Sequence, residues 1–433
     1  MAPDAASIKA GAKLATAGKW SEIGAHDRMV WGRCAGSGKT PYDVKFDRRQ
    51  NGYHCTCPSR KFPCKHVLAL LMLRADSPAA VPDCDQPPSW ADDWLTAREE
   101  KQAKKAAASS RPKTDKPVNA KAQAKRAAAR ESKVADGLQR LELWMRDIVR
   151  RGIASLQSES DEFWTDAARR LNDAQCPTLA TRVGALAAIP FSGEGWPQRM
   201  LAELGQITLL IDAYNNPDLP DPLRQEVRQL IGFPVSAADL AERGTTIPDR
   251  WALVAQTTET VENMQVERTW LVGRQTGRRG LMLQFAVGNR SFGKIVVPGI
   301  EAEGEVTAYP GVTGQRVAIG DLSDAAAITR RLPGDATIGE LLSHHTSTLA
   351  ANPWHRRSLA VLHDVRLLPP GVFRAGWWAV DSTGQALPLA KGDHWAMLAT
   401  IGDAAVDLFA EWEGGRLQPL SCWSAAQGWR SFP

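Results

Sequence analysis

The residue pattern that most constrains this chain is a cluster of cysteine and histidine near its N-terminus. In the stretch YHCTCPSRKFPCKHVLALL, Cys55-x-Cys57 is followed after six residues by Cys64-x-His66. Three thiolates and one imidazole form a donor set that suits tetrahedral Zn²⁺. Protein ligands would fill all four positions, which indicates one structural zinc ion rather than a hydrolytic centre. A chance cluster or a redox Cys-x-Cys pair would leave the closely following Cys-x-His pair unexplained.

The sequence around the cluster predicts strands followed by a helix. Residues 28–33 and 42–47 read as strands, because apolar and polar residues alternate in the second of them. Residues 53–55 would form the return strand. The apolar run at 64–76 reads as a buried helix that ends before Pro78. The expected module is therefore a small ββα unit.

In these predicted elements, the four ligands can face one another. Cys55 and Cys57 are two residues apart at a strand end, so their sulfurs lie on one side. Cys64 and His66 begin the helix, where the helix N-terminus favours a thiolate. His54 would point to the opposite face, and we do not expect it to be a ligand. One zinc ion would then join a hairpin to a helix. The free energy of binding this ion would contribute largely to the folding of the module.

The other cysteines predict neither a second metal site nor a disulfide framework. The chain has seven cysteines, and its N-terminal residues lack the apolar centre of a secretory signal. Cys34 and Cys84 flank the cluster, and we expect both to be buried free thiols.

The stretch GSGKT resembles the end of a phosphate-binding loop but fails its pattern. With Gly38-Lys39-Thr40 as the last residues of G-x-x-x-x-G-K-[ST], the first glycine would have to stand at position 33, which is Arg33. A helix must follow such a loop, whereas residues 42–46 read as a strand. We therefore predict a turn between two strands and no nucleotide at this position.

The pattern C-x-C-x6-C-x-H, preceded by strands and running into an apolar helix, resembles the SWIM-type zinc finger. The resemblance covers roughly residues 28–75, and Cys55, Cys57, Cys64 and His66 fill its four ligand positions. The flanking residues look like those of bacterial members. The resemblance implies a zinc-binding ββα module that binds DNA or other proteins. It also implies an AAA ATPase as a possible protein partner, because bacterial relatives are often encoded beside one.

Composition divides the chain into four parts and predicts an α+β multi-domain fold. Residues 1–95 form the zinc-stabilised module. Residues 96–134 are low-complexity alanine and lysine, and they predict a basic linker with helical stretches. Residues 135–235 carry apolar residues at helical spacing and predict a helical module. Residues 236–433 predict a β-rich C-terminal module.

Within the C-terminal module we expect short strands separated by turn signals, with one helix among them. The expected helix is 338–351, and the expected strands are 250–261, 267–274, 280–288, 358–368, 376–382 and 394–401.

Charge points to nucleic acid as one partner. Residues 1–75 carry 13 lysine and arginine residues against 5 aspartate and glutamate residues, and residues 101–133 carry 11 against 2. Basic clusters bind phosphates by releasing counterions. The candidate nucleic-acid contacts beside the cysteine cluster are Arg48, Arg49, Arg60, Lys61 and Lys65.

Other observations favour a protein-protein scaffold as the alternative. Arg60, Lys61 and Lys65 could simply offset the net negative charge of three thiolates on one Zn²⁺. The helix after His66 is nearly all apolar, so it is unsuited to a DNA groove. The chain has 16 tryptophans, and tryptophan is enriched at interfaces although most rings fill cores.

Two further features bear on the scaffold hypothesis. Trp90 and Trp94 are four residues apart and could share one helix face. The acidic residues of this region could fold back onto the basic finger. They are Asp83, Asp85, Asp92 and Asp93.

We expect no enzymatic activity. The sequence lacks G-x-S-x-G, H-E-x-x-H and spaced acidic metal motifs. His344 and His345 are adjacent in a predicted helix and should not present both rings to one side. His363 and His394 are expected to be structural or surface residues. No apolar run reaches the ~18 residues of a membrane span, and we expect a cytoplasmic protein.

Overall fold

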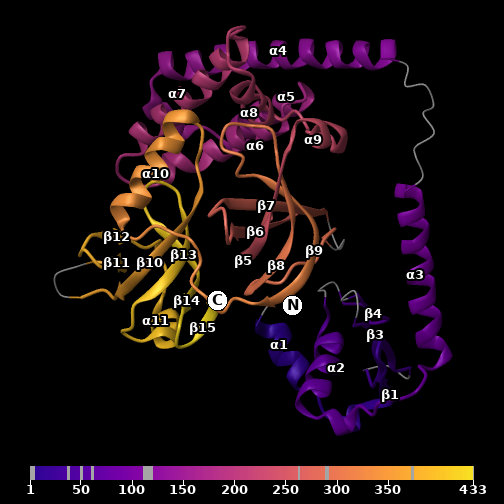
Figure 1. The fold of residues 1–433 in the computed structure, drawn as a ribbon. Coiled ribbons are helices and arrows are strands. Elements are labelled where there is room, and N and C mark those ends of the chain that lie inside the picture. Colours follow the sequence, from indigo (N-terminus) through magenta and orange to yellow (C-terminus); the bar gives the residue numbers. More distant parts are fainter. Residues whose placement is uncertain are drawn as a thin grey trace. The chain divides into compact units, whose positions relative to one another are not determined.

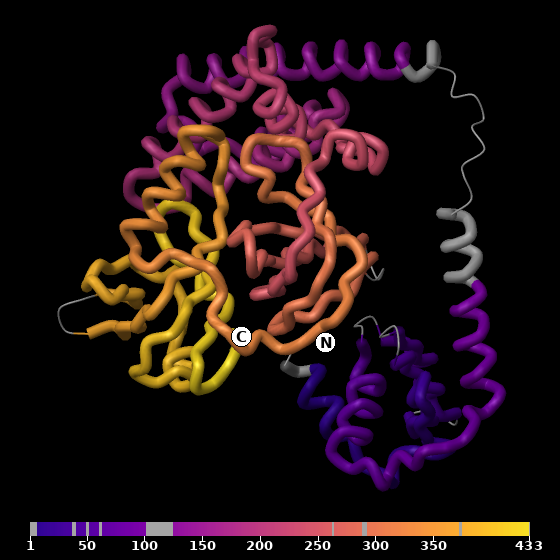
Figure 2. Tube along the Cα trace, in the orientation of Figure 1, coloured from indigo at the N-terminus to yellow at the C-terminus, as the bar shows by residue number. Residues whose placement is uncertain are grey.

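The computed structural model shows separate compact units. It describes residues 5–36, 40–48, 52–59, 63–110, 120–261, 264–287, 292–371 and 375–432, with the backbone alone at 5–6, 101–110 and 120–123. One unit comprises Met1–Val118 with Ala286–Ile295, and the other comprises Asn119–Phe285 with Val296–Pro433. The fold is α+β, with a small N-terminal sheet, a helical middle part and a β-rich C-terminal part, in the order shown in Figures 1 and 2.

The N-terminal module is a four-stranded antiparallel sheet in the order β1-β2-β3-β4. Its elements are α1 (Ala5–Ala12), η1 (Ala17–Lys19), β1 (Trp20–Ala25), β2 (Met29–Cys34), β3 (Tyr42–Asp47), β4 (Gly52–Cys55), α2 (Lys65–Asp76), η2 (Pro78–Ala80) and α3 (Ser89–Ser110). The predicted strand, strand, return strand and helix are all present. The sequence analysis missed β1 and α1, which enlarge the expected ββα unit.

Helix α2 covers one face of this sheet. It packs on β2, β3 and β4, and α1 packs on α2 in turn. Val44 and Phe46 point to this face from β3 and meet Val67 and Leu70 of α2. The alternation of β3 and the apolar run of α2 therefore supply the two halves of one core.

The start of α3 covers the opposite face. Met29 and Trp31 of β2 are buried there with Ala91 and Leu95 of α3. Because β2 is central in the sheet, it places side chains in both cores.

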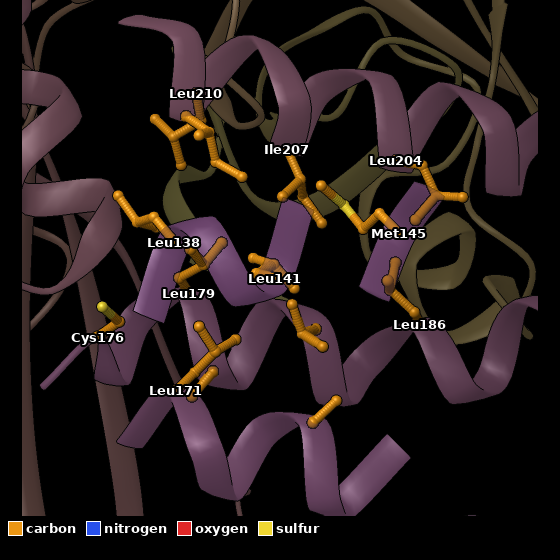
Figure 3. Packing of buried hydrophobic residues seen from close by; sticks show 14 of the residues in the cluster. Leu138, Leu141, Met145, Leu171, Cys176, Leu179, Leu186, Leu204, Ile207 and Leu210 are labelled. Carbon is orange, nitrogen blue, oxygen red and sulfur yellow. The ribbon is translucent and has the colours of Figure 1, made fainter. Parts of the chain in front are cut away.

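Residues 120–243 form the helical part. Its elements are α4 (Ala120–Arg151), η3 (Ile153–Ser158), α5 (Asp161–Asp173), α6 (Pro177–Ala185), η4 (Leu186–Phe191), α7 (Trp196–Asn215), α8 (Asp221–Ile231) and α9 (Ala237–Arg243). Leu138, Leu141 and Met145 of α4 are buried in its core among side chains from α5, α6 and α7 (Figure 3).

The helical core begins inside the stretch that composition assigns to the linker. Val134 is fully buried in this core. Glu131 accepts hydrogen bonds from Tyr214 (2.6 Å) and Arg228 (2.7 Å). Helix α4 already starts at Ala120, so the C-terminal end of the basic stretch belongs to the helical part. Within the linker range, 96–110 and 120–134 are helical, and 111–119 lie outside the described residues.

The C-terminal part contains two antiparallel sheets. The five-stranded sheet has the order β7-β6-β5-β8-β9 and the six-stranded sheet the order β12-β11-β10-β13-β14-β15. The elements are β5 (Thr245–Val261), β6 (Met264–Gly273), β7 (Arg279–Val287), β8 (Ile300–Ala308), β9 (Val317–Ala327), α10 (Ile338–Ala351), β10 (Ser358–Leu368), β11 (Trp378–Val380), β12 (Ala386–Pro388), α11 (Trp395–Ile401), β13 (Val406–Trp412), β14 (Leu417–Ser424) and β15 (Gly428–Ser431).

The five-stranded sheet curls toward closure. Leu281 of edge strand β7 forms a parallel bridge with Arg316, the residue before edge strand β9. A separate core fills the inside of the curl, where Trp251 and Leu271 are buried. The curl thus gives this sheet a core of its own.

A second core joins the two sheets. It contains Val254 of β5 and Phe409 of β13. The Trp270 indole donates a hydrogen bond across the sheets to the buried carboxylate of Glu411 (2.7 Å), and Ser421 donates to the Val254 carbonyl (2.5 Å). Helices α10 and α11 contribute to a further core with the six-stranded sheet.

The strand predicted at 394–401 is wrong. Residues Trp395–Ile401 form helix α11, whose first turn is held by the Asp393 carboxylate accepting from the Trp395 N–H (3.0 Å). Met397 and Ile401 are buried, and their spacing of four is the helical one. A run this short fits both the strand period of two and the helical period of about 3.6 residues, and packing against the six-stranded sheet decides which structure forms. The strand predictions at 250–261, 267–274, 280–288 and 358–368 and the helix at 338–351 are confirmed.

None of the helices described is both long enough and apolar enough to cross a bilayer.

Gly137 lets α4 approach α5, and this contact can be tested. A Cβ at Gly137 would overlap the Cβ of Ala174, a side chain that cannot move aside. We expect Gly137→Ala to destabilise the chain by about 1–2 kcal/mol, because overpacking outweighs the ~1 kcal/mol gain in helix propensity. Thermal unfolding measures the change.

Gly205 of α7 is the matched control, because a Cβ there meets nothing within 4 Å. Gly205→Ala should therefore be neutral or stabilising, by up to ~1 kcal/mol. Adding Ala174→Gly to Gly137→Ala should restore part of the lost stability. A double variant no more stable than Gly137→Ala would show that the overlap is not the cause.

Candidate metal centre

The four predicted ligands lie at the junction of a strand and a helix. Cys55 is the last residue of β4, and Cys57 follows it by two. Cys64 caps the N-terminus of α2 in an extended conformation, and His66 is the second residue of that helix. The order that the sequence predicted is therefore the order in the structure.

The donor atoms of these residues converge. All four lie within 4.8 Å of one another. The His66 Nδ1 atom is 3.8 Å from the Cys55 sulfur and 3.9 Å from the Cys64 sulfur. Zinc bonds of about 2.3 Å to sulfur and 2.0–2.1 Å to nitrogen, at tetrahedral angles, separate such atoms by about 3.6 Å. The donor set thus fits one tetrahedral zinc ion.

Neighbouring groups hold the ligands in place. Between the two strand cysteines, Thr56 donates its backbone N–H to the Asp43 carbonyl (3.1 Å) and accepts the Asp43 N–H on its hydroxyl (3.0 Å). The His66 ring lies 4.9 Å from the Tyr42 ring, centroid to centroid. Strand β3 therefore supports both the Cys-x-Cys segment and the imidazole.

Comparison with protein families agrees with this geometry. Residues 41–74 match the model of the SWIM zinc finger. The chain carries a SWIM zinc finger. Residues 129–231 match the model of the SWIM-associated four-helix bundle domain. No curated protein and no solved structure matches the chain.

The SWIM finger binds one structural zinc ion, through Cys55, Cys57, Cys64 and His66. Protein atoms fill all four positions, so the ion would serve to fix the β4–α2 junction rather than to activate water. Among the residues described, no second group of three or more His, Cys, Asp or Glu side chains has converging ligand atoms.

The cysteines of the finger differ in acidity. The hydrogen bond between Cys55 and Cys64 lowers the pKa of Cys64 to about 3 and raises the pKa of Cys55. Burial raises the pKa of Cys57. In the metal-free finger, Cys64 is therefore the first thiolate, and zinc must displace protons from the other two sulfurs.

The remaining cysteines and the histidine near the site lie outside the ligand set, as predicted. Cys34 is fully buried, and burial raises its pKa to about 11. Cys84 is only half-buried, so the expectation of full burial is wrong for it. His54 is exposed and lies on the α3 side of the sheet, 6.3 Å from the Trp94 ring.

The GSGKT stretch joins two strands. Strands β2 and β3 pair antiparallel up to Cys34 and Tyr42, and no helix follows the stretch directly. Its residues 37–39 lie outside the described part of the chain. The strand context that argues against a phosphate loop is confirmed.

The predicted nucleic-acid contacts are only partly described. Arg49, Arg60 and Lys61 lie outside the described residues. Lys65 is exposed at the first position of α2. Arg48 is also exposed, and its guanidinium donates to the His26 carbonyl (3.2 Å).

The sequence analysis overlooked three lysines on the same module. Lys9 of α1, Lys13 in the turn directly after α1, and Lys19 of η1 are exposed. They contributed only to the net charge, because the sequence gives no sign that α1 packs beside α2. Together with Lys65 they form the group that we call the zinc-edge lysines.

Replacing one ligand should release the metal. We expect Cys64→Ser to lose the one zinc ion per chain and to unfold the finger, because ion binding supplies much of the folding free energy of such modules, typically ~10–16 kcal/mol of apparent binding energy. Cys84→Ser should keep one zinc ion per chain, since Cys84 is not a ligand. Elemental analysis and near-UV circular dichroism of the purified chain measure both effects. Full zinc in Cys64→Ser would disprove the ligand assignment.

Zinc affinity should fall as the pH falls, because protons compete for the ligand sulfurs. With Cys64 already a thiolate and the pKa of Cys55 and Cys57 raised, binding should release about two protons. The dissociation constant should then rise about 100-fold when the pH drops from 8 to 7. Competition titration with a chromogenic chelator measures this slope. A slope of about three protons would contradict the lowered pKa of Cys64.

Proposed function

We propose that this protein is a non-enzymatic nucleic-acid-binding protein whose SWIM finger contacts backbone phosphates through the zinc-edge lysines. The observation that carries the proposal is the distribution of charge on the finger. Among the described residues, four exposed lysines around α1 and the start of α2 have no acidic partner, whereas the arginines on the α3 side of the sheet are paired with carboxylates.

The zinc-edge lysines lie on or beside segments that pack at the start of α2, where Cys64 and His66 stand. Helix α1 contacts α2 at Gly11, where a Cβ would lie 3.1 Å from Leu68 and 3.3 Å from the Lys65 carbonyl. Lys9 lies two positions from Gly11, about 200° around the helix, and therefore on the side of α1 turned away from α2. Lys13 follows α1 by one residue, and its N–H donates to the Lys9 carbonyl (3.4 Å), so the two lysines lie one turn apart. Lys19 and Lys65 both act on the Cys34 thiol and lower its pKa against the effect of burial.

Among the described residues, these four lysines form no ion pair, whereas four arginines of the same module do. Those pairs are Arg28–Glu99, Arg33–Glu22, Arg33–Asp43, Arg74–Asp83 and Arg98–Asp47.

Lys45 is likewise engaged within the module. It is buried, donates to the Trp90 carbonyl (2.7 Å) and lies over the Trp90 ring together with Arg33. Its ammonium group therefore holds α3 against the sheet and is not available to a partner. Among the described residues of the module, the exposed cations without an ion pair are thus the zinc-edge lysines and Arg48, which donates to the His26 carbonyl.

The geometry favours contact with phosphates over reading of bases. The apolar side chains of α2 are buried against the sheet, so this helix does not present a recognition face. Flexible lysines bind phosphates with little sequence preference and with strong salt dependence. The lysine-rich stretch that follows α3 would add to the same electrostatic attraction.

A protein partner is the second candidate, and one observation favours it. The acidic patch after α2 folds back on the finger, where Asp83 pairs with Arg74 (2.6 Å). This pairing reduces the positive charge that nucleic acid would meet. In that case zinc would only stabilise the module, and the finger would serve as an adaptor, for which an AAA ATPase is the partner that the family resemblance suggests.

A gel-shift titration tests the nucleic-acid proposal. Changing all four zinc-edge lysines to glutamine should weaken binding of a DNA duplex and lower the slope of log affinity against log salt by about 3–4, one contact per lysine. Unchanged affinity and slope would disprove phosphate contact at this surface. Complete lack of binding by the unmodified chain at low salt would disprove nucleic-acid binding altogether.

The matched control removes four exposed cations outside the finger. These are Arg243, Arg330, Arg366 and Lys391. The control variant should keep the salt slope of the unmodified chain. A partner that co-purifies with the full-length chain and survives nuclease treatment would favour the adaptor role instead.

A further inference from the structure

A second cluster of titratable side chains lines a cavity in the C-terminal β-rich part. The cavity has a volume of about 320 Å³ and lies where α10 meets the starts of β7 and β10. Six polar residues of its lining are Arg278, Arg279, His344, His345, His355 and Ser358. The volume is near the lower end of the ~300–1,000 Å³ typical of small-molecule sites.

The adjacent histidines of α10 both reach this cavity, contrary to the sequence prediction. His344 turns toward Asp335, and His345 turns toward Ser358 and His355. Neighbouring positions on a helix are about 100° apart, so the two rings border the cavity from adjacent directions. The sequence analysis missed this because their partners come from other segments.

A buried carboxylate positions one half of the cluster. Asp335 is 1% exposed and binds the Arg279 guanidinium (2.7 Å) with one oxygen and His344 Nδ1 (2.6 Å) with the other. Arg279 also donates to the Leu359 carbonyl (3.0 Å). A guanidinium and an imidazole are thereby held at fixed positions at the cavity wall.

A hydroxyl shared by two imidazoles forms the other half. Ser358 Oγ lies 2.7 Å from His355 Nε2 and 3.4 Å from His345 Nδ1. Arg278, which also lines the cavity, is exposed and forms no ion pair among the residues described. Among the residues described, Asp335 is the one carboxylate in direct contact with the cluster, so the two arginines leave it with a net positive charge.

We propose that this cavity binds a small phosphate-bearing molecule, held chiefly by the unpaired Arg278 with the histidines and Ser358, beside Arg279, which Asp335 fixes at the wall. Guanidinium groups match phosphate oxygens in pairs, and hydroxyl and imidazole groups complete such sites. The inference stands apart from nucleic-acid binding by the finger, because none of its residues belongs to that module.

Two other assignments fit the cluster less well. The nitrogen atoms of the three histidines do not converge as metal ligands do, unlike the finger's donor set. A serine nucleophile would need a base that a third group orients, but among the described residues no carboxylate contacts His355 or His345. The cluster therefore supports binding of an anion better than either chemistry.

Titration of the zinc-loaded full-length chain with inorganic phosphate and pyrophosphate tests the proposal. Histidine side-chain NMR signals should shift saturably, those of His345 and His355 among them, and calorimetry gives the affinity. Arg278→Gln should weaken pyrophosphate binding about tenfold, through loss of one charged contact. Ser358→Ala should weaken it severalfold.

Arg366→Gln is the matched control, since Arg366 is exposed on β10 outside the cavity. It should bind pyrophosphate as the unmodified chain does, and so should the zinc-edge glutamine variant. Equal affinity in Arg278→Gln and Arg366→Gln would overturn the proposal, as would acetate binding as tightly as phosphate. Thermal unfolding of each variant checks that it is folded. These outcomes do not depend on whether the finger binds nucleic acid.

Discussion

The coordination of one zinc ion at the β4–α2 junction is the interaction on which the N-terminal module depends. The segment between Cys55 and Cys64 connects the edge of a small sheet to the helix that covers it. Its described backbone is tied to β3 mainly through Thr56. A single ion bound by both ends of this segment fixes the helix over the sheet. The core between them can then form from few apolar residues.

The same ion shapes the electrostatics of the finger. Three thiolates on one Zn²⁺ carry a net negative charge, which nearby lysines can offset. Lys19 and Lys65 act electrostatically on Cys34, beside this centre. On the α3 side of the sheet, Arg28, Arg33 and Arg98 pair with carboxylates. Among the described residues, unpaired lysines therefore lie around α1 and the start of α2, and this is the basis of the proposed contact with a polyanion.

The C-terminal part is organised by two sheets that share a core and by polar groups buried between them. Glu411 accepts from the Trp270 indole across that boundary, and Asp335 fixes Arg279 and His344 beside it. Buried carboxylates are costly unless they are paired. Glu411 is paired at the sheet boundary, and Asp335 is paired beside the cavity. The pairing of Asp335 is consistent with a binding role for that cavity, which is distinct from the role of the finger.

Local pattern in the sequence determined the zinc ligands, the hairpin and helix that carry them, the strand context of GSGKT and most long elements. These depend on spacing within about fifteen residues, where side-chain period and donor chemistry are directly visible. The seven-residue helix α11 was mistaken for a strand, because so short a run fits both periods. Only the tertiary structure decided which cations are free and which are paired, since Arg28 meets Glu99 from a distant segment. It alone brought His345, His355 and Arg278 to one cavity, because chain folding, and not sequence spacing, sets the distance between residues on separate elements.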